Sequence, residues 1–152
     1  MLRHTLATLA YRAGKALRGA PPDFSGFAPA PGSRTAGQIL AHLCDLMDWG
    51  TSIARGAQTW SDSPPQAWDD EVQRFFFALA TFNNAITEQP PDETLANKLF
   101  QGPIADALQH TGQLTMMRRL AGAPIKGENY FVAEIVAGHV TENQPPPRRE
   151  FD

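Results

Sequence analysis

The chain has 152 residues, of which 42% are hydrophobic and 19% charged, and its formal net charge at neutral pH is −3. This composition is typical of one globular domain over residues 1–152 and excludes a disordered or collagen-like chain. The Lys and Arg residues are scattered rather than clustered, which argues against nucleic acid as a partner. Charged residues also interrupt every hydrophobic stretch before it reaches the ~18 residues of a membrane span, so we expect no membrane partner.

Cysteine use and the first residues bear on the compartment. The single cysteine, Cys44, has no partner for an intramolecular disulfide, and we expect it to be a small buried thiol. Residues 1–20 lack the apolar core and cleavage site of a signal peptide. We therefore expect a cytoplasmic protein.

The prolines divide the chain into helical windows, because proline is not tolerated in a helix interior. The first window, residues 1–20, repeats apolar residues at helical spacing and reaches a stop signal at Gly19. Its stripe is Leu2, Leu6, Leu9, Ala13 and Leu17. Residues 20–33 are rich in Pro, Gly and Ser and are expected to form a long connection that Phe24 and Phe27 hold to the surface.

Two further windows carry capping signals. Thr35 and Gln38 form a capping box that opens a helix over about 35–55. Ser63 and Gln66 form a second capping box, with prolines in the first turn and acidic residues at 69–71 where the helix dipole favours negative charge. The stripe of this third helix is Trp68, Val72, Phe75, Phe76, Leu79, Phe82 and Ile86. We expect it, like the tryptophans Trp49 and Trp60, to belong to the core.

The fourth helix is predicted to start at Pro103 and to end after Arg118 and Arg119, with Gly122 as a left-handed cap. Residues 126–140 fit either a short helix or an extended tail packed across the bundle, and the last residues should be extended. No strand-turn-strand pattern is present. The sequence therefore predicts an all-α four-helix bundle with a short C-terminal extension.

Polar residues share the inward sector of the fourth helix. Asp106, His110 and Gln113 return to nearly the same face at helical spacing, and His42 lies at the edge of the apolar stripe of the second helix. Two imidazoles and one carboxylate are suitable metal ligands, and three protein ligands leave a position open for water or substrate. The alternative is that His42 is a histidine at the edge of the core, and that Asp106 and His110 are an i, i+4 side-chain pair on one helix that binds no metal.

Three segments, GQILAHLCDLMDW, ADALQHTGQLTMMRRLAGAP and ENYFVAEI, resemble the DinB-like (DinB/YfiT) superfamily of metalloenzymes over nearly the whole chain. In that family a His in an iLaH segment and an H-x-x-x-H-R-G-Q segment supply three metal ligands. His42 matches the first position, and His110 and Gln113 match the last His and the Gln of the second segment. The chain departs from the pattern at Asp106, which stands where the first His belongs, and at Thr111, which replaces the Arg.

The resemblance implies a DinB-type bundle that holds a divalent ion, such as zinc, nickel, iron or manganese, through His42, Asp106 and His110. It further implies a metal-dependent transferase or hydrolase that uses a small thiol, such as bacillithiol or mycothiol, or another small-molecule substrate. Gln113 would either hold a ligand in place or satisfy the neighbouring polar pair. The alternative function is a non-catalytic metal- or ligand-binding dimeric bundle.

Assembly is predicted from the fourth helix. Ile104 and Leu108 point away from the polar sector and leave an apolar patch, and uncovered apolar surface of this kind marks an interface. Proteins of the resembled family pack as dimers through such helices, so we expect a homodimer. The alternative is that residues 24–27 or the 129–140 tail cover the patch within one chain.

Overall fold

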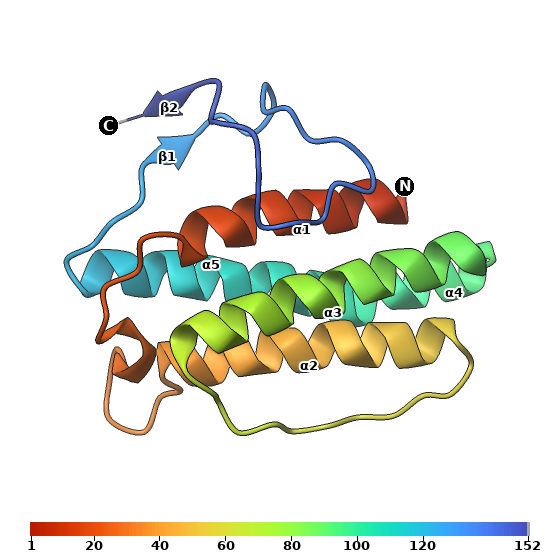
Figure 1. Cartoon of the computed structure of the whole chain (residues 1–152), viewed down its shortest axis with the longest axis horizontal. Helices are drawn as coiled ribbons and strands as arrows, with labels where there is room; N and C mark the ends of the chain where they lie inside the picture. The colour runs from red at the N-terminus through yellow and green to blue at the C-terminus, as the bar shows by residue number, and fades with distance from the viewer. Residues whose placement is uncertain (152) are drawn as a thin grey trace.

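The computed structural model describes residues 1–151 as a bundle of helices that run side by side (Figure 1). The long helices in this part of the chain are α1 (Leu2–Leu17), α2 (Ala36–Ala54), α3 (Trp68–Glu88) and α5 (Ala105–Leu120). The shorter elements are η1 (Phe24–Gly26), α4 (Glu93–Leu99), η2 (Phe100–Ile104), β1 (Gly127–Glu128) and β2 (Glu150–Phe151). The all-α fold class is thus confirmed. Over residues 1–151, no helix combines the length and the apolar character that crossing a membrane requires.

The apolar stripes of the long helices meet in one core. Its fully buried members include Leu6, Leu9, Leu40, Leu43, Phe75, Leu79, Phe82 and Leu114. Helices α2 and α3 approach closely at Gly50, where an added Cβ would lie 2.5 Å from the ring of Phe82. Helix α2 also packs against α5, so the inward faces of these two helices meet.

The predicted start of α2 is confirmed. The backbone N–H of Thr35 donates to Oε1 of Gln38 at 2.8 Å, and the N–H of Gln38 donates to the Thr35 hydroxyl at 3.2 Å. The connection before α2 is held to the bundle as expected, because Phe24 is buried and packs edge to face against Trp68 with ring centroids 5.2 Å apart. Local capping and one aromatic contact therefore fix the entry into α2.

The predicted start of α3 is wrong. The helix begins at Trp68, and no side chain caps it, although the acidic residues 69–71 do occupy its first turn. Ser63 binds elsewhere: its N–H and its hydroxyl each donate to the buried carboxylate of Asp45 on α2 at 2.8 Å. Arg74 of α3 donates to the same carboxylate. A proline disfavours the helical conformation of the residue before it, so the segment from Ser63 to Gln66 is not helical. The hydrogen bonds of Ser63 to Asp45 attach this segment to the bundle.

A helix that the sequence did not predict, α4, leads directly into α5. Asp92 caps α4, since its carboxylate accepts from the N–H of Leu95 at 2.8 Å. The π-helical η2 joins the two helices, and Pro103 lies inside it rather than at a helix start. A π-turn accommodates a residue that has no N–H to donate. The end of α5 is as predicted, with Gly122 in the left-handed region at φ 76°.

The apolar patch on which the homodimer prediction rests is not exposed. Ile104 is fully buried in the core. Leu108 is half-buried beside Ile125 and Tyr130 of the segment that follows α5. This agrees with the alternative that a segment of the same chain covers the patch. The homodimer therefore stays a prediction, but this patch no longer supports it.

The segment after α5 is extended and crosses over α1 (Figure 1), so the tail is not a helix. Within it, β1 and β2 pair antiparallel, with Glu128 opposite Glu150. Glu128 accepts hydrogen bonds from the hydroxyl of Tyr11 at 2.6 Å and from Lys15 at 2.8 Å, and Lys15 also donates to Glu150 at 2.7 Å. A buried ion-pair network therefore fastens the C-terminal segment to α1.

Candidate metal centre

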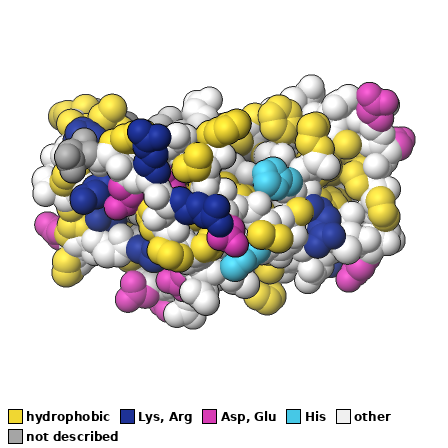
Figure 2. Space-filling model, turned by 90° about the horizontal axis from the view of Figure 1, so that it is seen from above, with side chains coloured by type: hydrophobic (Ala, Val, Ile, Leu, Met, Phe, Trp, Pro, Cys, Tyr) yellow, Lys and Arg dark blue, Asp and Glu magenta, His cyan; other side chains and the backbone are white. Residues whose placement is uncertain are grey.

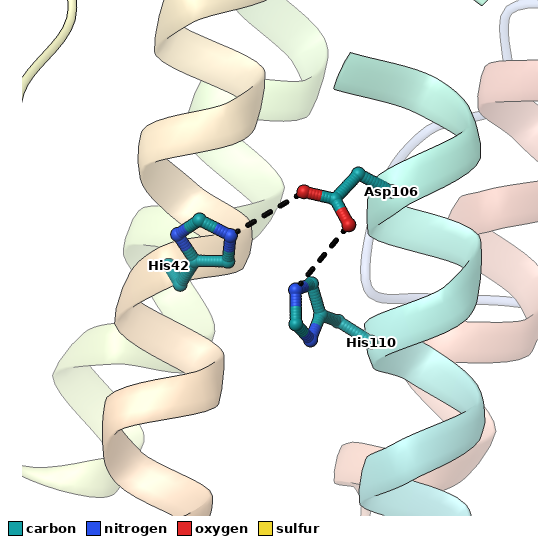
Figure 3. Close-up of side chains that lie close together, drawn as sticks. All are labelled: His42, Asp106 and His110. Carbon is teal, nitrogen blue, oxygen red and sulfur yellow. Dashed lines mark ion pairs between the residues drawn. The ribbon is translucent and has the colours of Figure 1, made fainter. Parts of the chain in front are cut away.

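His42, Asp106 and His110 converge between α2 and α5 (Figure 3). Nε2 of His42 lies 3.5 Å from one carboxylate oxygen of Asp106, and Nε2 of His110 lies 3.4 Å from the other. The two imidazole rings meet edge to face with centroids 4.7 Å apart. Asp106 and His110 share a face because they are one helical turn apart. The packing of α2 against α5 brings His42 to them.

Gln113 orients the ring of His110. Its Oε1 lies 2.7 Å from Nδ1 of His110, and because an amide oxygen only accepts, Nδ1 carries the proton and donates it. When Nε2 carries no proton, it presents a lone pair toward the carboxylate of Asp106. Two acceptors that face each other at 3.4 Å repel unless a cation or a proton lies between them. Gln113 thus lies beside the polar pair, as its helical spacing predicted.

His42 lies among aromatic rings and near positive charge. Its ring meets that of Trp60 edge to face at 5.6 Å, and Trp60 meets Trp49 in the same way at 5.8 Å. Burial lowers the pKa of His42, the neighbouring His110 and Arg34 act in the same direction, and Asp106 opposes the change. The imidazole of His42 is therefore neutral near pH 7, the state in which it can be a ligand.

The donor set fits a divalent metal ion. Two imidazole nitrogens and a carboxylate oxygen are ligands that zinc, nickel, iron and manganese accept. With bonds of about 2.0–2.2 Å, neighbouring ligands of a tetrahedral ion are about 3.3–3.6 Å apart. Each histidine Nε2 lies at this separation from a different oxygen of Asp106, 3.5 Å for His42 and 3.4 Å for His110. One ligand atom from each of the three residues lies within 4.8 Å of the others.

Two surface pockets adjoin the three residues. One, of about 480 Å³, is lined by His110 and Gln113 and has apolar walls of Ile39, Met116, Met117 and Leu120. The other, of about 430 Å³, includes His42, Gln38 and Asp62 in its lining. Arg34 lines both pockets, and the side chain of Asp106 is 41% exposed. A small molecule could therefore reach the candidate ligands from either pocket.

The remaining histidines and the cysteine lie outside this group. Cys44 is fully buried, its thiol donates to the backbone oxygen of Glu71 at 3.6 Å, and burial raises its pKa. It is thus the buried thiol that the sequence suggested. His4 is exposed, and His139 lies 2.6 Å from the backbone oxygen of Asn143.

Two neighbours of the site, Trp60 and Arg34, were not predicted from the sequence to lie there. Trp60 is 47% exposed, so its assignment to the core is wrong, whereas Trp49 and Trp68 do pack against the core. Both missed residues lie outside regular helices, where no periodicity assigns a side chain to a face. An exposed aromatic residue in a proline- and serine-rich loop was the available signal.

Comparison of the sequence and the structure with known proteins identified no relative of this chain. The chain matches no protein-family model, and no curated protein or solved structure is significantly similar to it. The geometry of the site therefore carries the functional argument.

Proposed function

We propose that this protein is a divalent-metal-dependent enzyme of DinB type, a transferase or hydrolase that acts on small molecules. One observation carries the proposal: Nε2 of His110 and Nε2 of His42 face the two oxygens of Asp106 at 3.4 and 3.5 Å, and Gln113 holds the other ring nitrogen of His110. With both Nε2 atoms unprotonated, a cation among these acceptors stabilises the arrangement.

The residues have distinct roles in this proposal. His42, Asp106 and His110 would hold the ion, and Gln113 would keep the His110 ring in its tautomer and orientation. A bound divalent ion lowers the pKa of a thiol or a water molecule and so supplies a nucleophile near neutral pH. This is the chemistry that a thiol-dependent transferase or a hydrolase needs.

The pocket beside His110 would hold the substrate. Its walls of Ile39, Met116 and Leu120 would bind apolar groups, and Arg34 in its lining offers a charge to an anionic group. Pockets of about 300–1,000 Å³ are the usual size for small-molecule sites, and this one has about 480 Å³. The substrate would therefore lie with its reacting atom close to His110.

The test is elemental analysis of untagged protein, followed by comparison of His110→Ala with His4→Ala. We expect stoichiometric metal in the wild type and in the His4 variant, since His4 is exposed and outside the site. The His110 variant should lose the metal while its helical circular dichroism stays unchanged. Turnover of the loaded wild type with a thiol and an electrophile, or with an ester, then separates transferase from hydrolase. Equal metal content in both variants would contradict the ligand assignment.

A second candidate is a metal-free bundle in which Asp106 bridges the two histidines. The observation in its favour is that each histidine Nε2 lies within 3.5 Å of a different oxygen of Asp106, so protonated histidines would pair with the carboxylate directly. In that case purified protein contains no metal, and Asp106→Ala lowers the free energy of unfolding without affecting any ion.

A further inference from the structure

A third pocket lies on the other side of α5, away from the candidate metal centre. It has a volume of about 540 Å³ and lies between α1, α5 and the C-terminal segment. We call it the α1–α5 pocket. Its lining includes Arg12, Gly112, Arg119, Lys126, Tyr130 and Phe151, and none of its lining residues belongs to the pockets beside His42 and His110.

Positive charge dominates the α1–α5 pocket. Within residues 1–151, the side chains of Arg12, Arg119 and Lys126 form no ion pair or hydrogen bond, although Arg12 lies over the ring of Tyr130 at 4.1 Å. The carboxylates of Glu128 and Glu150 are both paired with Lys15. Among residues 1–151, the lining has three cations, Arg12, Arg119 and Lys126, and one carboxylate, Glu128, which leaves an excess of two positive charges in a chain whose net charge is −3. Such an excess attracts an anion.

On the α1 side of the molecule, most of the Lys and Arg side chains in view lie in the left half, among hydrophobic side chains and some Asp and Glu (Figure 2). This half lies over the C-terminal part of α1 and the two strands (Figure 1). Basic groups beside apolar surface suit a ligand that has both an anionic and an apolar part.

Gly112 is a glycine that the fold does not require. It lies within α5, its φ is not positive, and an added Cβ would meet no atom within 4 Å. By contrast, an added Cβ at Gly50 would meet Phe82. A glycine inside a helix destabilises it relative to alanine. Because Gly112 lines the α1–α5 pocket, its missing side chain keeps the floor of the pocket open, and a ligand can approach the helix backbone.

We propose that the α1–α5 pocket binds a phosphate monoester whose organic part is a flat aromatic group. Two guanidinium groups and an ammonium match the charge and geometry of a phosphate better than those of a single carboxylate. The rings of Tyr130 and Phe151, with Leu108 and Ile125, provide apolar surface for the aromatic part. The site is independent of any metal at His42, Asp106 and His110.

The test uses the full chain treated with a chelator, with phenyl phosphate as the probe and inorganic phosphate and phenol as its two halves. Calorimetry at low salt should show saturable binding of phenyl phosphate, about tenfold tighter than either half, since inorganic phosphate lacks the aromatic contact and phenol lacks the charge-assisted hydrogen bonds. Raised salt should weaken the binding.

Variants locate the site. Arg119→Gln and Lys126→Gln should each weaken binding about tenfold, while Arg55→Gln, which removes an exposed charge at the end of α2, should leave it unchanged. Gly112→Leu should abolish binding by filling the pocket, and Gly112→Ala should raise the thermal midpoint and retain binding.

Absence of saturable binding would overturn the proposal. So would binding of phenyl phosphate that Arg119→Gln and Gly112→Leu leave unchanged. Equal affinity for inorganic phosphate would overturn the aromatic part of the ligand assignment. Metal content at His42, Asp106 and His110 affects none of these outcomes, so the two proposals stand or fall separately.

Discussion

The imidazole of His42 packs edge to face against the indole of Trp60, with ring centroids 5.6 Å apart. A loop residue is thereby placed beside the candidate metal centre, while its ring stays 47% exposed. Tryptophan emission should therefore report what binds to His42.

We expect Ni²⁺ or Co²⁺, which quench nearby fluorophores, to quench emission in a saturable way that ends at stoichiometric metal. Trp60→Phe should remove most of this response, and Trp68→Phe should keep it, because Trp68 packs against Phe24 instead. A fluorescence titration checks this. Equal responses in the two variants would mean that the ion binds elsewhere.

Removal of Gln113 should weaken metal binding without removing a ligand. Partners that orient a ligating histidine contribute about 10–100-fold to metal affinity, so Gln113→Ala should raise the dissociation constant by that range. Gln109→Ala is the matched control, since Gln109 is exposed on the same helix. Competition with a chelating dye measures both variants. Identical affinities would show that the hydrogen bond to His110 has no role in metal binding.

Asp106 should determine which metal is preferred. Imidazole suits zinc and nickel better than a carboxylate does, so Asp106→His should tighten binding of these ions relative to manganese. Titrations of the wild type and the variant with each ion give the ratio. If the ratio does not move, Asp106 does not contact the ion.

Metal retention should depend on pH through His42. Burial lowers the pKa of this group, as do the neighbouring His110 and Arg34, so the ligand form persists near neutral pH. Retention should fall as pH drops below the ordinary histidine value of about 6.5, because a protonated imidazole cannot be a ligand. Dialysis at a series of pH values, followed by elemental analysis, measures this.

The same shift predicts the stability of the metal-free protein. With a folded pKa below the unfolded one, the unfolded chain takes up a proton first, so stability is lost as pH falls from about 6.5 toward the folded pKa. His42→Gln should reduce this loss, as measured by urea unfolding at several pH values. An unchanged pH dependence in the variant would contradict the lowered pKa.

The contact between the C-terminal segment and α1 should contribute strongly to stability. Burial acts to lower the pKa of Lys15, but the hydrogen bonds to Glu128 and Glu150 outweigh it and raise the pKa. Lys15→Met would leave the carboxylate of Glu128, whose side chain is 0% exposed, without its counter-charge. The free energy of unfolding should fall by about 3–5 kcal/mol.

The control for this variant is Arg148→Met, which breaks the exposed ion pair of Arg148 with Glu134. Surface pairs contribute about 1 kcal/mol or less, so denaturant unfolding should separate the two variants clearly. Similar losses in both would show that the Lys15 network is not effectively buried.

Local patterns sufficed for much of the fold. The Thr35–Gln38 capping box and the stripes of α1, α2 and α3 are read from residues within a few positions of each other, because helical periodicity and capping are short-range. The Ser63–Gln66 box has the same local pattern and yet forms no helix, since Asp45 on another helix binds Ser63. Pro103 likewise lies in a π-turn rather than at a helix start.

The candidate site divides in the same way. Helical spacing by itself placed Asp106, His110 and Gln113 on one face of α5, because residues three and four positions apart are neighbours. The approach of His42, and the placing of Trp60 and Arg34 around it, depend on how α2 packs against α5 and on where the loops before and after α2 lie. These are contacts between residues far apart in the sequence, set by which apolar faces bury each other best, and only the tertiary structure decides them.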